Sequence, residues 1–208
     1  PNVLKMKETK RKILDKSLEL FNRDGFTTVS IRQIASELGI SHSNLIYHFN
    51  TKNDIVIALH QELLEKAITL NETTIHHPNF IESLFNSTKN GFKILYQYRF
   101  LMIELNTILK ENEKLKHIFI EIESIRAKMY RIVINRAIEE GYMREQEYDN
   151  EYDFFILTIK IFSDSWISSS EIYETTSSQE IIEKYCSLFV KLFFPYLTAK
   201  GKNEFLNF

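Results

Sequence analysis

The chain has 208 residues, of which 44% are hydrophobic and 26% are charged, and its formal net charge is −2 at pH 7. These values are ordinary for a globular protein and exclude a disordered or fibrous chain. The single cysteine, Cys186, excludes an internal disulfide and a cysteine-rich zinc site. The longest apolar run, 55–59, is far shorter than the roughly 20 residues that span a bilayer. We therefore expect a cytoplasmic protein with no membrane partner, no metal and no other cofactor.

Glycine and proline are scarce, with five and three residues in the whole chain. Because these residues interrupt helices, their scarcity favours long helices and an all-α fold. We expect an N-terminal domain over 1–52, a connecting helix over 52–71 and a second domain over 72–208.

The first helix is predicted over 8–24, where Leu14, Leu18 and Phe21 recur with helical spacing and Gly25 follows. Ser30 and Gln33 have the spacing of a capping box, which starts a second helix.

A tight connection at Gly39 and Ile40 then leads to Ser41, which can cap a very short third helix. Leu45 and Phe49 supply the apolar side of that helix. Another capping box, over 51–54, starts the fourth helix.

The clearest boundary is His76-His77-Pro78-Asn79, because proline is tolerated only at a helix start. Beyond it, helical periodicity predicts five further helices, for a total of about nine. They lie near residues 80–98, 100–107, 115–137, 150–166 and 178–192.

Charge is distributed unevenly along the chain. Residues 1–52 hold nine basic and five acidic residues, a net +4, whereas the remainder carries −6. A basic segment joined to an acidic body is typical of a nucleic-acid-binding module attached to another domain.

Residues 30–52 form a helix-turn-helix pattern, in which the second helix enters the major groove of DNA. With Leu45 and Phe49 facing the core, five polar side chains point largely outward: His42, Ser43, Asn44, Tyr47 and His48. Tyr47, His48 and Lys52 have the reach to contact phosphates, and the helix starts near Ser30 and Ser41 offer free backbone N–H groups.

Over about residues 8–64 the sequence resembles the TetR/AcrR family of bacterial transcriptional regulators. The resemblance rests on Gly25-Phe26, 30–35, Leu38-Gly39-Ile40-Ser41 and 45–52. It implies a three-helix DNA-binding domain, a larger ligand-binding and dimerisation domain, and repression of a palindromic operator that a small molecule relieves. Carried over by position, it favours DNA contacts by Thr28, Ser30, Gln33, Ser43, Asn44, Tyr47, His48 and Lys52. One departure is Ile46, which stands where many members have a second aromatic residue.

A small hydrophobic effector is the expected ligand, bound in an apolar cavity between the later helices. The candidate ligand-binding residues are Phe92, Tyr96, Asn106, Phe119, Tyr130, Phe155 and Trp166. The resemblance further implies a homodimer formed by the last two long apolar helices. The candidate interface residues are Phe155, Phe162, Leu188, Phe189 and Leu192.

Two alternatives remain open at this point. One is an all-α enzyme with its active site in the C-terminal cavity, although the sequence has no phosphate-binding loop and no Gly-x-Ser-x-Gly motif. The other is an interaction protein whose helix-turn-helix binds protein rather than DNA.

Overall fold

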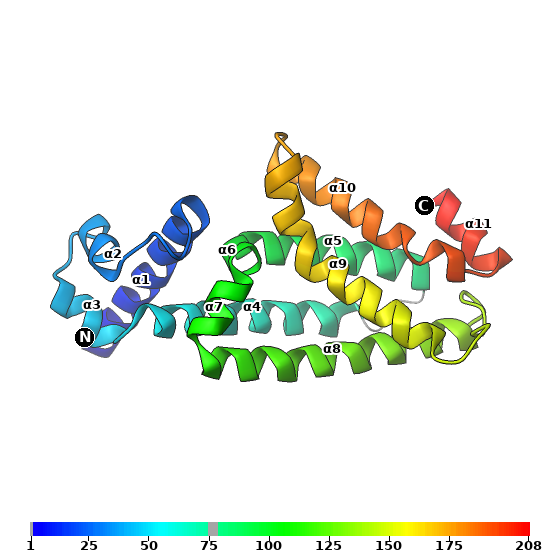
Figure 1. The fold of residues 1–208 in the computed structure, drawn as a ribbon, viewed down its shortest axis with the longest axis horizontal. Helices are drawn as coiled ribbons and strands as arrows, with labels where there is room; N and C mark the ends of the chain where they lie inside the picture. The colour runs from blue at the N-terminus through cyan, green and yellow to red at the C-terminus, as the bar shows by residue number, and fades with distance from the viewer. Residues whose placement is uncertain (1, 75–78) are drawn as a thin grey trace. The chain divides into compact units, whose positions relative to one another are not determined.

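A computed structural model of the chain describes residues 2–74 and 79–208, and within these ranges it contains eleven α-helices, one 3-10 helix and no β-strand (Figure 1). The predicted all-α fold is confirmed. In chain order the helices are α1 (Asn2–Asp24), α2 (Ile31–Glu37), α3 (His42–His48), α4 (Lys52–Thr74), α5 (Phe80–Gln97), α6 (Arg99–Ile103), α7 (Leu105–Glu111), α8 (Glu113–Glu139), α9 (Glu151–Tyr173), α10 (Ser178–Lys191), η1 (Phe194–Tyr196) and α11 (Ala199–Asn207). No helix in the described ranges has both the length and the apolar character needed to cross a membrane.

The chain divides into two compact units that differ from the expected domain limits. The first unit contains the chain up to Lys66 together with Gln97–Lys116, and the second contains Ala67–Tyr96 and His117–Phe208. Most of the predicted boundary at 76–79 lies outside the described residues. Its last residue, Asn79, accepts a hydrogen bond from the Glu82 N–H at 3.1 Å and so caps the start of α5.

The core of the first unit forms around aromatic rings from two distant segments. Phe21 of α1 contacts the ring of Phe26 at 5.5 Å and that of Phe100 at 5.1 Å between centroids. Gly25 follows the end of α1, and Gly39 lies between α2 and α3. Their φ angles are 86° and 64°, which residues with a Cβ rarely adopt.

Polar contacts join α6 to α1 and explain why 97–116 belongs to the first unit. The Asn22 side chain accepts a hydrogen bond from the Phe100 N–H at 3.1 Å and donates one to the Gln97 carbonyl at 2.8 Å. The predicted sixth helix is in fact two helices, α6 and α7, because the backbone leaves helical geometry at Glu104 (φ −108°, ψ 20°).

The second unit is built around its only tryptophan. The Trp166 ring lies parallel to the Phe92 ring, with 4.6 Å between centroids and 6° between planes, and Tyr185 of α10 lies 5.6 Å away. The helices α9 and α10 are neighbours in this unit. Aromatic packing therefore fills the space between α5, α9 and α10.

A paired charge fixes the loop between α8 and α9. Arg144 donates two hydrogen bonds to the carboxylate of Glu151, at 2.6 and 2.9 Å, in bidentate geometry. Hydrogen bonds from Arg144 and from the Glu147 N–H lower the pKa of Glu151 to about 2. The loop is thus held in place at the start of α9.

A buried histidine in α4 makes the stability of the first unit depend on pH. His60 is 5% exposed, and burial lowers the pKa of its imidazole to about 4 from the ordinary value of 6.5. As pH falls below 6.5 the unfolded chain takes up this proton before the folded chain does, so stability is lost as pH falls from 6.5 through 4.

We expect the wild-type chain to lose about 2 kcal/mol more unfolding free energy between pH 7.5 and pH 5 than the His60→Gln variant does. Urea unfolding followed by circular dichroism at the two pH values measures this difference. Other titrating groups are present in both proteins and cancel. Equal pH dependence of the two proteins would contradict the assignment.

Candidate nucleic-acid interface

The short helix α3 has one buried apolar face and one accessible polar face. Leu45 and Phe49 are 0% and 5% exposed, whereas Tyr47 is 71% exposed. The side chains of Ser41, His42, Ser43 and Asn44 are exposed, and His48 is half-buried. The sequence-predicted outward face of α3 is therefore accessible.

Serine side chains cap the two helices of the motif. The Ser30 Oγ accepts from the Gln33 N–H at 3.2 Å, and the Ser41 Oγ accepts from the Asn44 N–H at 3.1 Å. Thr28 is exposed and Gln33 is half-buried near the start of α2. The two serines therefore cap α2 and α3 as predicted.

Lys52 differs from the expected solvent-facing cation. Its ammonium donates to the carbonyls of Phe26 and Val29, at 2.6 and 3.0 Å, and lies 4.1 Å from the centroid of the Phe26 ring. Burial lowers the pKa of Lys52, while Glu111 and Glu104 oppose that shift. Two of its three N–H donors thus hold the turn between α1 and α2.

Sequence reasoning missed Glu104, which binds the same turn from another side. Its carboxylate accepts hydrogen bonds from the Phe26 N–H at 2.5 Å and the Thr27 N–H at 3.1 Å, and also from the Thr27 hydroxyl. A Cβ at Gly25 would lie 2.9 Å from the Glu104 Oε1, so glycine leaves room for the carboxylate. No local pattern links residues nearly 80 positions apart.

Most of the predicted ligand-binding residues do not line an open space. Phe92, Phe155 and Trp166 are buried in the aromatic core of the second unit, and Tyr96 stacks against Trp166 with 6.0 Å between ring centroids. Asn106 is exposed on α7, which belongs to the first unit. Phe92, Phe155 and Trp166 therefore pack inside the core of the second unit, and their role in ligand binding stays a prediction.

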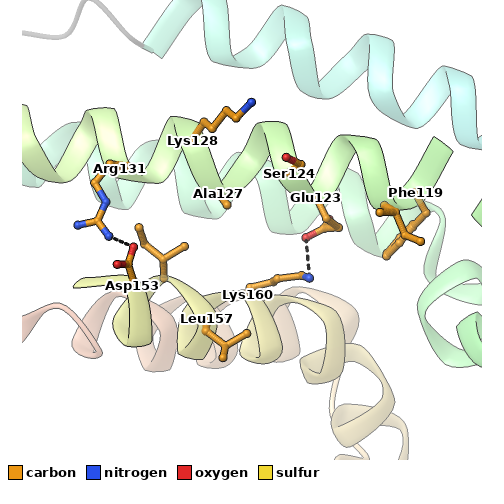
Figure 2. Close-up of a pocket in the computed structure, with 11 residues that line it drawn as sticks. Phe119, Glu123, Ser124, Ala127, Lys128, Arg131, Asp153, Leu157 and Lys160 are labelled. Carbon is orange, nitrogen blue, oxygen red and sulfur yellow. Dashed lines mark hydrogen bonds and ion pairs between the residues drawn. The ribbon is translucent and has the colours of Figure 1, made fainter. Parts of the chain in front are cut away.

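A groove of about 700 Å³ lies instead between α8 and α9 (Figure 2). Of the predicted ligand-binding residues only Phe119 lines it, while Tyr130 lines a small adjoining pocket. The full lining is Phe119, Ile120, Glu123, Ser124, Ala127, Lys128, Arg131, Asp153, Ile156, Leu157 and Lys160.

The predicted interface residues of α9 and α10 differ in how exposed they are. Phe155 and Phe189 are buried within the unit, and Phe162 and Leu192 are half-buried, so only Leu188 of the predicted set is exposed. The other large exposed residues facing outward in the middle of α9 are Phe154, Leu157 and Ile161. Their spacing of three and four places them on one helix face.

Comparison with protein-family models gives two matches that together span most of the chain. Residues 13–59 match the model described as bacterial regulatory proteins, tetR family, and residues 60–205 match the model described as bacterial transcriptional repressor. The chain belongs to the TetR family of transcriptional regulators. This confirms the resemblance that the helix-turn-helix sequence indicated.

The chain is also similar to individual transcriptional regulators. The chain is 26% identical over 145 residues to an uncharacterized HTH-type transcriptional regulator, YerO, of Bacillus subtilis, and the match covers 67% of this chain but 50% of that relative. A TetR-family regulator from Marinobacter aquaeolei superposes with a TM-score of 0.86 at 24% identity over 96% of both chains. A regulator from Saccharomonospora viridis, solved in complex with choline, superposes with a TM-score of 0.76 at 19% identity. That match covers 93% of this chain and 100% of the other. At these identities the two structures show a shared fold.

The contact of Glu104 with the turn between α1 and α2 can be tested by substitution. The Glu104→Gln variant loses the charge that strengthens hydrogen bonds to the turn, so we expect the amides of Phe26 and Thr27 to exchange with deuterium faster. The expected loss of unfolding free energy is about 1.5 kcal/mol, because Glu104 is only half-buried.

The matched control is Glu65→Gln, which neutralises an exposed carboxylate on α4 in the same unit. Unchanged exchange at both turn amides in Glu104→Gln would show that the carboxylate does not hold the turn.

Proposed function

We propose that the chain is a ligand-responsive repressor that binds a palindromic DNA operator as a homodimer. The observation that carries this proposal is α3, whose apolar anchors are buried and whose polar face is accessible. A major groove admits one α-helix, and its base edges present a distinguishable pattern of donors and acceptors. Family membership favours regulation over the enzyme alternative.

The proposed DNA contacts fall into two chemical groups. Ser43 and Asn44, exposed at the start of α3, are short enough to approach base edges, and an asparagine amide can pair with adenine. We assign contacts with phosphate oxygens to Tyr47, His42 and His48. The residues near the helix starts, Thr28, Ser30, Gln33 and Ser41, complete the proposed surface, with Lys52 as a positioning residue.

A dimer supplies the second recognition helix that a palindromic operator requires. One seven-residue helix contacts few base pairs, whereas two helices spaced about 34 Å apart reach successive turns of the groove. The exposed apolar side chains of Phe154 and Ile161 on α9 and Leu188 on α10 support a self-complementary interface there.

Ligand response is the remaining part of the proposal. The α8–α9 groove offers a volume suited to a small molecule, and the choline complex of the Saccharomonospora viridis regulator shows a ligand bound to a related fold. A ligand shifts the protein between DNA-binding and DNA-free states only by its difference in affinity for them.

Selection of DNA from a random duplex library by the purified chain tests the regulatory proposal. We expect a palindromic sequence to be enriched. Enrichment of no sequence at all would favour the protein-interaction alternative.

With the selected operator, Asn44→Ala should weaken specific binding about tenfold, the effect of losing one good base contact, while affinity for unrelated DNA stays the same. His48→Ala should weaken binding to both kinds of DNA because it removes a phosphate contact. Fluorescence anisotropy measures both affinities.

The control is His117→Ala, an exposed histidine on α8 in the second unit. If Asn44→Ala and His48→Ala bound the operator as tightly as this control, the contact assignment would be wrong.

The dimer proposal predicts that Ile161→Glu is monomeric at concentrations where the wild type sediments as a dimer, because a buried unpaired carboxylate opposes association. Analytical ultracentrifugation gives the mass. Leu206→Glu, which changes an exposed leucine on α11, should remain dimeric. A dimeric Ile161→Glu would place the interface elsewhere.

A further inference from the structure

The α8–α9 groove combines an apolar surface with one incompletely bonded charged group. Phe119, Ile120 and Ala127 of α8 line one side, and Ile156 and Leu157 of α9 line the other. Such a surface favours a ligand with an apolar body.

One of the two ion pairs at the groove is already complete. Arg131 donates a hydrogen bond to Asp153, and Figure 2 shows these two side chains pointing toward each other. Lys128 is exposed and points away from α9 in the same view, so water screens its charge.

The other ion pair, between Glu123 and Lys160, leaves one oxygen of the Glu123 carboxylate without a hydrogen-bond donor. The Glu123 side chain is 8% exposed, and its Oε1 accepts a hydrogen bond from Arg126 at 2.5 Å. Its Oε2 is buried and accepts no hydrogen bond from any residue that the structure describes. The Lys160 ammonium lies 3.8 Å from Oε2, which is beyond hydrogen-bond distance.

A donor from outside the chain would satisfy this oxygen. Leaving a buried carboxylate oxygen unbonded is unfavourable, and an ammonium group forms the strongest hydrogen bond to it. The side chain of Lys160 is long and 36% exposed, so a bound cation can displace the Lys160 ammonium toward water at small cost.

We infer that the α8–α9 groove binds an amphipathic amine, with its protonated nitrogen on the Glu123 Oε2 and its apolar body between α8 and α9. This inference names a ligand class for the ligand response proposed above and rests on that proposal. A carboxylate ligand meets repulsion from Glu123, and an alcohol donates one neutral hydrogen bond without compensating charge.

Three probes with the same tail test the inference on the full chain without DNA. Isothermal titration calorimetry at pH 7, at probe concentrations below micelle formation, compares decylamine, 1-decanol and decanoate. We expect decylamine to bind at least tenfold more tightly than either of the others. Equal or tighter binding of decanoate or 1-decanol, or no binding of decylamine, would overturn the inference.

Two substitutions separate a ligand-binding Glu123 from a merely structural one. Glu123→Gln should weaken decylamine binding at least tenfold, because it removes the charge at the acceptor. Lys160→Met should strengthen decylamine binding at least threefold, because it removes the competing ammonium. The matched control is Glu121→Gln, an exposed carboxylate on the same helix, which should bind as the wild type does.

A third variant, Ala127→Trp, fills the groove and should abolish decylamine binding while circular dichroism confirms an unchanged helical fold. Unaltered binding by Glu123→Gln or Ala127→Trp, or weaker binding by Lys160→Met, would place the amine elsewhere. These titrations contain no DNA. A failure of the amine inference can therefore be distinguished from a failure of the DNA-binding proposal, which operator selection tests separately.

Discussion

The turn between α1 and α2 is held by two opposite charges, and the position of the helix-turn-helix depends on it. Glu104 accepts hydrogen bonds from N–H groups of the turn, and Lys52 donates to its carbonyls. The helices α2 and α3 have seven residues each, too few to be stable in isolation. Their orientation is therefore fixed by residues outside the proposed DNA-facing surface.

Much of the fold was predictable because apolar residues repeat with the helical period and serine caps precede several helices. Two features were not. The chain leaves helical geometry at Glu104 because that residue serves a distant turn, which no local pattern encodes. The last helix, α11, is largely polar; its Gly201 is buried where a Cβ would lie 2.3 Å from the Tyr142 carbonyl. Tertiary contacts thus determine both features.

The two candidate sites differ in how far sequence could define them. Leu45 and Phe49 are four residues apart and define the buried face of a short helix. The accessible face on the opposite side can therefore be predicted. Periodicity does not distinguish an aromatic side chain in a core from one beside a groove. Phe92 and Trp166 stack directly on each other, whereas the open volume lies between α8 and α9. Only packing in three dimensions separates these cases.

The chain has a single tryptophan, Trp166, and it lies in the aromatic core of the second unit. Its indole is 2% exposed, so its emission shifts to longer wavelength when that core opens to water. Helix content, in contrast, reports on both units together. Intrinsic fluorescence is therefore a natural optical reporter of melting in one half of the molecule, and comparing the two spectroscopic transitions reveals whether the halves unfold in concert.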